Sequence, residues 1–191
     1  IPGEIIETPA VQKDSLEEES FPFIEEIAVM ANKGELFDVF SNIETERKKI
    51  NIEEEEYYSK TIWLNKNENN EVRIELRPKD TTTVFRIIVE GKENKIASRT
   101  GVKTGISIEE MNAINKIPVD FYGFNWDLGG MAKFNSGSLE NKNLQIFFKT
   151  EKKVPGRFKG DLIHTFEESK EAQLELFVEK IIYTPSKNNQ L

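Results

Sequence analysis

The chain has 191 residues, of which 37% are hydrophobic and 31% are charged, a composition that suits one domain with a hydrophobic core or two very small domains. It holds no cysteine, which excludes disulfides, thiol nucleophiles and thiolate metal sites. The net charge of −8 is uneven, because residues 1–60 carry 16 acids and 6 bases whereas residues 61–191 carry 18 acids and 20 bases. An acidic first third disfavours nucleic acid and anionic membrane as partners.

The first twenty residues are polar and acidic and end in DSLEEES. This pattern predicts a flexible acidic leader over residues 1–20, followed by one domain over residues 21–191. The first residue is Ile1, which fits a position after a cleaved signal peptide, after a lipidated cysteine or at a cloning boundary. No apolar run approaches the roughly 18 residues that a spanning helix needs. Membrane contact is therefore expected only through an upstream lipid anchor.

The segment after the leader predicts a short strand and then a short helix. Ile27 and Val29 alternate with other residues and are expected on one face of the strand. Residues 34–42, GELFDVFSN, are expected to form the helix. Its buried residues would be Leu36, Phe37, Val39 and Phe40. The four carboxylates of residues 53–56 are interpreted as the hydrated start of a strand rather than a metal site, since strand side chains alternate between faces.

Alternation of apolar and polar side chains predicts the strands in the middle of the chain. Residues 57–64 are rich in aromatic and β-branched types, and the turn sequence KNENN follows them. Residues 72–77, VRIELR, alternate most clearly, and residues 84–89 and 98–103 predict further strands. The inward-facing residues would be Val72, Ile74 and Leu76, and then Phe85, Ile87 and Val89. The outward-facing residues of VRIELR would be Arg73, Glu75 and Arg77.

Ser107 and Glu110 form a capping box, in which each side chain binds the backbone amide of the other residue. The box predicts a helix over residues 108–115. Residues 144–149 predict a strand with alternate apolar residues facing inward. The last segment, LELFVEKIIY, matches both a helix and a strand, and the β-rich stretch FVEKIIYT favours a strand.

These elements together predict an α+β fold that consists mainly of antiparallel sheet with a few short helices. The segment GELFDVFSN is also interpreted as a degenerate counterpart of GISIEEMNAIN. Two remote α+β repeats are therefore an alternative organisation of the same fold class.

Residues 117–134, IPVDFYGFNWDLGGMAKF, hold the densest cluster of large aromatic residues and glycines. Two interpretations stay open. In the first, the phenylalanines and Trp126 pack in the core and the paired glycines form a turn. In the second, Tyr122, Trp126 and Asp127 edge a concave patch that binds a sugar, a peptide or another small polar ligand.

A basic stretch, KTEKKVPGRFKG at residues 149–160, is interpreted as a hairpin. Its candidate partner-binding residues are Lys152, Lys153 and Arg157. They would bind an acidic protein partner or the acidic segment of the same chain. The alternative is a solvated hairpin tip without a partner, because exposed loops are usually charged.

Motifs for catalysis are weak in this sequence. The single histidine, His164, has Ser169 nearby, but no GxSxG elbow is present. No HExxH, EF-hand or phosphate-binding glycine motif occurs, so neither a metal nor a cofactor is expected. Asp120 and Asp127 flank the aromatic cluster and are the one carboxylate pair considered for a hydrolase.

Residues 101–134 resemble a recurrent pattern in uncharacterised secreted or lipid-anchored proteins of Bacteroidetes-type bacteria. That pattern has a glycine-rich start, a capped helix, an asparagine and an aromatic Gly-Phe-x-Trp-Asp-x-Gly-Gly stretch. The matching residues are Gly105, Ser107, Glu110, Asn115, Phe121, Gly123, Phe124, Trp126, Asp127, Gly129 and Gly130. The resemblance covers about one sixth of the chain and implies a secreted, periplasmic or outer-membrane-anchored protein, without any catalytic residue to carry over.

A second, local similarity concerns the segment GISIEEMNAIN. It is similar to the short helix of β-lactamase-inhibitor-like and outer-membrane-assembly lipoprotein domains, although Lys116-Ile117 stands where those domains have a glycine-containing turn. The expected function is therefore a non-catalytic secreted or cell-envelope protein that binds a protein partner or a small ligand. A hydrolase and a purely structural domain are the alternatives.

Overall fold

The computed structural model describes residues 21–52 and 54–186, so the predicted acidic leader lies outside the described residues. In chain order the elements are α1 (Ile24–Lys33), the 3₁₀ helix η1 (Leu36–Asp38), β1 (Ile43–Ile52), β2 (Glu55–Leu64), β3 (Val72–Leu76), β4 (Val84–Glu90), α2 (Ile108–Asn115), β5 (Asp120–Tyr122), β6 (Ala132–Lys133), β7 (Leu144–Lys149), the 3₁₀ helix η2 (Gly156–Phe158), β8 (Ile163–His164), α3 (Phe166–Glu171) and β9 (Phe177–Tyr183).

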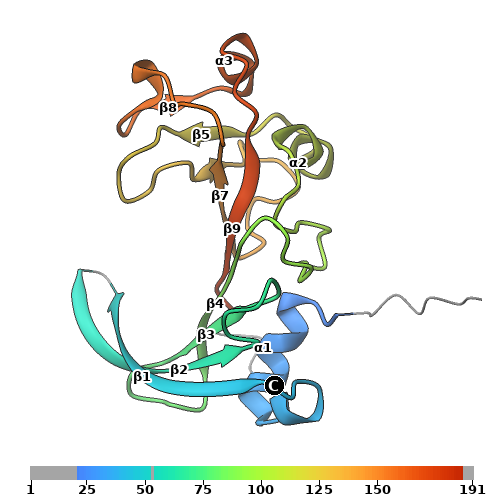
Figure 1. The fold of residues 1–191 in the computed structure, drawn as a ribbon, viewed down its shortest axis with the longest axis vertical. Helices are drawn as coiled ribbons and strands as arrows, with labels where there is room; N and C mark the ends of the chain where they lie inside the picture. Colours follow the sequence, from blue (N-terminus) through green and yellow to red (C-terminus); the bar gives the residue numbers. More distant parts are fainter. Residues whose placement is uncertain (1–20, 53, 187–191) are drawn as a thin grey trace, which may run out of the picture.

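The strands form two antiparallel sheets. The larger has six strands in the order β1-β2-β3-β4-β9-β7, and the smaller has the order β6-β5-β8. Figure 1 shows β1 to β4 and α1 at one end of the molecule, with the small sheet, α2 and α3 at the other. Strands β7 and β9 join the two ends. The predicted α+β fold with mainly antiparallel sheet and few short helices is confirmed.

The segment around Ile27 is helical, so the predicted strand at Ile27 and Val29 is wrong. Ile24, Ile27 and Ala28 are buried at the helical spacing of three and four residues, while Val29 is exposed. The Glu26 carboxylate accepts from the Phe23 amide at 3.1 Å at the start of α1. Gly34 ends the helix with φ +76°, a conformation that glycine adopts at little cost. The helical spacing of Ile24, Ile27 and Ala28 is a stronger signal than the alternation of Ile27 and Val29, on which the strand prediction rests.

The helix predicted over residues 34–42 is a single 3₁₀ turn, η1. Leu36 and Phe40 are buried as expected, but Phe37 is 75% exposed and Val39 is 54% exposed. No side chain caps η1, whereas both partners of the capping box are in place at α2. The two segments interpreted as counterparts therefore have different local structures.

Strands β2, β3, β7 and β9 form where the alternation of residues predicts them. Strand β4 also forms, but Phe85 is only half-buried because it is the extra residue of a register shift between the Glu75–Arg86 and Leu76–Val84 pairs. A bulge of this kind breaks the alternation of faces. The strand predicted over residues 98–103 is a tight turn instead, with one isolated bridge between Ala97 and Lys103.

The helix predicted from the capping box is confirmed as α2. The Glu110 amide donates to the Ser107 hydroxyl at 3.2 Å, and the Ser107 amide donates to the Glu110 carboxylate at 2.8 Å. Ile108 and Met111 are buried beneath the helix. These two residues belong to one hydrophobic cluster that extends from α1 to β9. None of the described helices is long and apolar enough to span a membrane.

Candidate functional site

The aromatic residues of the segment 117–134 divide between the core and the surface. Phe121 is fully buried and Phe124 is 9% exposed. The Phe121 ring stacks on Phe158, with centroids 6.1 Å apart and an interplanar angle of 11°. The core interpretation therefore holds for these two phenylalanines.

The paired glycines form a turn that docks the connection between β5 and β6 against β7. Gly130 has φ +77°, and a side chain on it would place Cβ 2.2 Å from the Phe148 carbonyl oxygen. The Phe148 amide donates to the Gly130 carbonyl at 2.8 Å. Only glycine allows this approach of two backbones.

Tyr122 and Trp126 lie together and are half-buried, while Asp127 is exposed. The two rings meet edge to face with centroids 5.6 Å apart. The indole Nε1 of Trp126 donates to the Gly123 carbonyl at 2.8 Å, so its one donor is engaged within the segment. Ligand binding by these three residues stays a prediction.

The basic stretch 149–160 is not a hairpin. Strand β7, before it, pairs with β9, whereas β8, after it, pairs with β5. The stretch therefore connects the two sheets. Lys152 binds Glu175 at 2.7 Å and the Gln173 carbonyl at 2.9 Å.

The other two basic residues of the stretch differ in their surroundings. The Arg157 guanidinium lies 5.0 Å from the centroid of the Phe158 ring, and Lys153 is exposed. Partner binding by Lys152, Lys153 and Arg157 stays a prediction.

The candidate catalytic groups have different surroundings. Asp120 begins β5 opposite Lys133, and Asp127 is exposed in the following turn. His164 is buried against Phe158, with ring centroids 4.6 Å apart, and neither of its ring nitrogens has a hydrogen-bond partner among the described residues. The Ser169 hydroxyl donates to the Phe166 carbonyl at 2.6 Å. The hydrolase alternative stays a prediction.

A groove of about 1080 Å³ lies between the start of α1, the loop after β4 and the start of α2. Three of its charged groups are engaged within the protein. Lys92 binds Glu151 at 2.9 Å, and Glu110 belongs to the capping box of α2. The charges that line the groove are of both signs.

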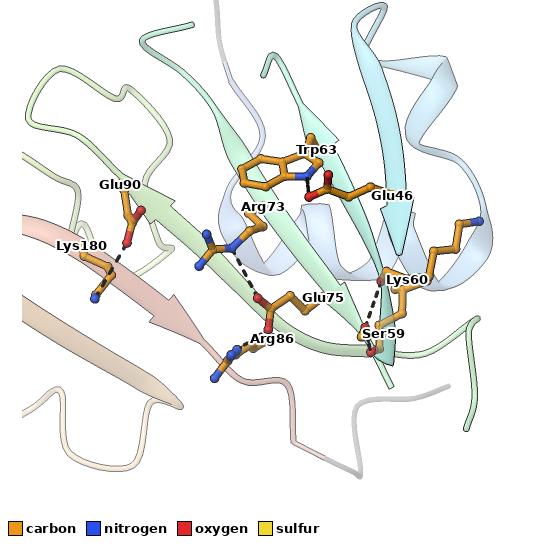
Figure 2. Close-up of polar contacts among 10 residues, drawn as sticks. Glu46, Ser59, Lys60, Trp63, Arg73, Glu75, Arg86, Glu90 and Lys180 are labelled. Carbon is orange, nitrogen blue, oxygen red and sulfur yellow. Dashed lines mark hydrogen bonds and ion pairs between the residues drawn. The ribbon is translucent and has the colours of Figure 1, made fainter. Parts of the chain in front are cut away.

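The face of the large sheet that lies away from α1 carries a different arrangement, which we call the polar sheet face and define by Trp63, Arg73, Glu75 and Arg86 (Figure 2). Trp63 stands opposite Arg73 in the β2–β3 register, and Glu75 stands opposite Arg86 in the β3–β4 register. Directly opposed residues of antiparallel strands share a face. The register of three strands thus gathers these side chains.

Glu75 is the buried centre of the polar sheet face, with only 3% of its side chain exposed. Its Oε2 atom lies 2.6 Å from Arg86 Nε, and its Oε1 atom lies 3.4 Å from Arg73 Nε. The side chains of Arg73 and Arg86 remain 24% and 26% exposed. Both arginine side chains therefore keep part of their surface in solvent while they contact the buried carboxylate.

Trp63 lies beside this pair and is 8% exposed. Its Nε1 atom donates to the Glu46 carboxylate at 2.8 Å. The Lys48 and Lys66 amino groups and the Arg73 guanidinium lie 5.3–5.5 Å from its ring centroid, within the range of cation–π attraction. The indole is thus covered by cationic side chains rather than by another layer of the fold.

At the margin of the polar sheet face, cationic side chains lie beside carboxylates. Lys66 lies 3.1 Å from Glu44 and 3.9 Å from Glu46, and its hydrogen bond with Glu44 raises the pKa of Lys66 above its ordinary value of 10.5. Lys180 lies 3.8 Å from Glu90. At the centre, by contrast, two guanidinium groups share one carboxylate, so positive charge is in excess there.

Two buried polar atoms at the centre also lack partners. Among the described residues, the Nε atom of Arg73 has no acceptor with hydrogen-bond geometry. The hydroxyl group of Thr61 also has no hydrogen-bond partner among these residues. Thr61 stands opposite Glu75 in the β2–β3 register. Buried polar groups are usually satisfied, so this cluster has hydrogen-bonding capacity that the fold itself leaves unused.

Sequence reasoning placed Arg73 and Glu75 on the outward face and expected solvent there, which is wrong for Glu75. The carboxylate is buried because the side chains of Arg73 and Arg86 lie over it. The alternation in VRIELR indicates the shared face. It does not indicate the register with β4 that brings in Arg86.

Comparison with protein-family models found no match, and comparison with curated proteins found none either. Among solved structures, the chain is similar to the crystal structure of the uncharacterized protein yfeY from Escherichia coli, with a TM-score of 0.44 and 15% sequence identity. The alignment covers 80% of this chain and 88% of that one.

Proposed function

We propose that this protein is a non-catalytic binding protein and that its polar sheet face binds an oxyanionic group, a carboxylate or a phosphate, of a ligand. The observation that carries this proposal is the pair of part-exposed arginine side chains whose guanidinium groups lie on one buried carboxylate. Guanidinium groups bind carboxylate and phosphate through parallel hydrogen bonds. The excess positive charge at the centre favours an anion over a neutral ligand.

The buried carboxylate has a specific role in this proposal. Glu75 holds Arg86 by a hydrogen bond of 2.6 Å and lies beside Arg73, so the side chains lose less conformational freedom when a ligand binds. Trp63 lies beside the two arginines, but cationic side chains cover its ring and leave it 8% exposed. The proposed ligand contact is therefore with the guanidinium groups and not with the indole.

Binding is preferred to catalysis because the buried carboxylate is already engaged. Glu75 contacts both guanidinium groups, so it is not free to act as a general base or nucleophile. Among the described residues, no group of three or more histidine, aspartate and glutamate side chains is arranged to hold a metal ion.

We expect Arg86→Lys to weaken anion binding by about tenfold, since lysine keeps the charge but loses the planar fork. Glu75→Gln should strengthen it, because glutamine keeps an acceptor oxygen that can hold Arg86 but removes the negative charge that competes with the ligand for the guanidinium groups. The measurement is the shift of the thermal midpoint with phosphate and with benzoate, which obeys mass action. The two probes distinguish a phosphate ligand from a carboxylate ligand.

Arg99→Lys is the matched control, because Arg99 forms an exposed pair with Glu26 at 2.8 Å elsewhere in the molecule. This variant should bind both anions as the wild type does. If Glu75→Gln folds and binds more weakly than the wild type, the Arg73–Glu75–Arg86 cluster is only a structural network and the proposal fails.

We also propose that the protein is secreted or lies in the cell envelope, periplasmic or anchored to the outer membrane. The support is the resemblance of residues 101–134 to secreted and lipid-anchored proteins. Cell fractionation of the natural host should recover the protein outside the cytoplasm. Recovery in the cytoplasm alone would contradict this location.

A further inference from the structure

Strand β1 forms a long, free edge of the large sheet. It has ten residues, and among the described residues it pairs with β2 alone. Most of its side chains are exposed. Figure 1 shows β1 and β2 curving away from the rest of the molecule. The outer backbone groups of an edge strand can pair with an added strand.

Two adjoining hollows lie beside this edge, on the sheet face that packs against α1. Each has a volume of about 520 Å³, and both are lined by Thr45, Lys60 and Thr81. The first continues over Ile62 to the exposed ring of Phe37. Together the two hollows form a groove. It is apolar near η1 and polar toward the end of the β1–β2 pair where β1 turns into β2.

The polar end of the groove holds two cations without counter-charges. Arg47 and Lys60 stand directly opposite each other in the β1–β2 register, and both line the second hollow. Neither forms an ion pair within the part of the chain that the structure describes, although the Arg47 guanidinium lies 5.4 Å from the Tyr58 ring. Like charges that face each other across strands are destabilising, and an acidic partner would remove this cost.

We infer that the free edge of β1 and this groove bind an extended, acidic segment of a partner protein by strand addition. Alternate side chains of an added strand point to the same face. Acids of the partner would meet Arg47 and Lys60, and apolar side chains two and four positions on would lie over Ile62 and against Phe37. The surface is independent of the polar sheet face, because the two lie on opposite faces of the sheet.

The probes are the blocked peptide Glu-Thr-Glu-Thr-Val-Thr-Phe, its reversed sequence, and a version with lysine in place of glutamate. The wild type should bind one of the two acidic peptides and not the lysine peptide. Its backbone amides in β1 should then gain protection from hydrogen exchange. The double variant Arg47→Glu/Lys60→Glu should bind the acidic peptide at least about tenfold more weakly, since attraction becomes repulsion.

Two further variants separate charge from folding. Arg47→Lys/Lys60→Arg keeps both charges and should retain binding, and Lys142→Glu changes an exposed lysine in the distant turn before β7 and should also retain it. Equal binding of the lysine peptide, or loss of binding in Lys142→Glu alone, would overturn the inference. Concentration-dependent dimers that the double variant abolishes would overturn it as well, because the edge would then pair with a second copy of the chain.

Discussion

Asn115, at the end of α2, is fully buried and uses its whole side chain. Its Nδ2 atom donates to the Ile117 and Phe134 carbonyls, each at 2.8 Å, and its Oδ1 atom accepts from the Leu139 amide at 3.0 Å. The residue thus ties α2 to the segment that follows β6. The asparagine of the resembled pattern has a structural role in this chain.

We expect Asn115→Ala to lower the free energy of unfolding by about 2–4 kcal/mol, because it leaves buried backbone groups without partners. Urea unfolding followed by circular dichroism would measure this loss. Asn51→Ala, on the exposed face of β1, should change the same free energy by less than about 0.5 kcal/mol. Similar losses in the two variants would show that the Asn115 network contributes little.

Single residues also show where sequence reasoning is limited. The sequence pointed to Phe121, Phe124 and Trp126 as one group, but only the phenylalanines are deeply buried. Trp126 is half-buried and lies three positions before Gly129, the first of the paired turn glycines. The number of aromatic residues in a segment does not indicate which of their side chains enter the core.

The loop between β3 and β4 is an element whose stability depends on an exposed carboxylate. The Asp80 carboxylate accepts from the Thr82 hydroxyl at 2.6 Å and amide at 3.1 Å, and from the Thr83 hydroxyl. These hydrogen bonds, those from Thr82 first, lower the pKa of Asp80 from its ordinary value of 3.8 to about 2. The ionised form therefore holds the loop more strongly than the protonated form does.

A lowered pKa in the folded state stabilises the protein above the pKa of the unfolded chain, and this stability is lost as the pH falls through the folded value. We expect the wild type to unfold at higher urea than Asp80→Asn at pH 6. The difference should shrink below pH 4 and be largely lost below pH 2, as Asp80 becomes protonated in the folded protein. A difference that stays constant from pH 6 to pH 2 would rule out this linkage.

Elements with a strong local signal could be predicted from the sequence. The capping box of Ser107 and Glu110 gave α2, and the alternation in VRIELR gave β3. Helix α1 was missed because its buried residues, Ile24, Ile27 and Ala28, recur at the helical spacing of three and four residues. This spacing becomes visible only when more residues are considered than the pair Ile27 and Val29. The pairing of β4 with β9 could not be predicted, since antiparallel partners far apart in sequence leave no local pattern.

At the scale of the whole molecule, the large sheet has two chemically different faces. One packs its apolar residues against α1, and next to them the free edge of β1 borders a groove with unpaired cations. The other exposes a pair of arginines above a buried glutamate. Register across β2, β3 and β4 creates this second face. No single segment of the sequence contains the four residues of the polar sheet face, so no local motif points to them. The aromatic–glycine segment, by contrast, stands out within one segment.

The most direct test of anion binding is a titration of the isotope-labelled protein with phosphate and with benzoate, followed through the side-chain Nε–Hε NMR signals of its arginines. If the polar sheet face binds an anion, the Arg73 and Arg86 signals should show saturable shifts, and the Arg99 signal should stay unchanged as an internal control. Shifts that grow linearly with anion concentration, or that affect Arg99 equally, would contradict a built oxyanion site on the polar sheet face.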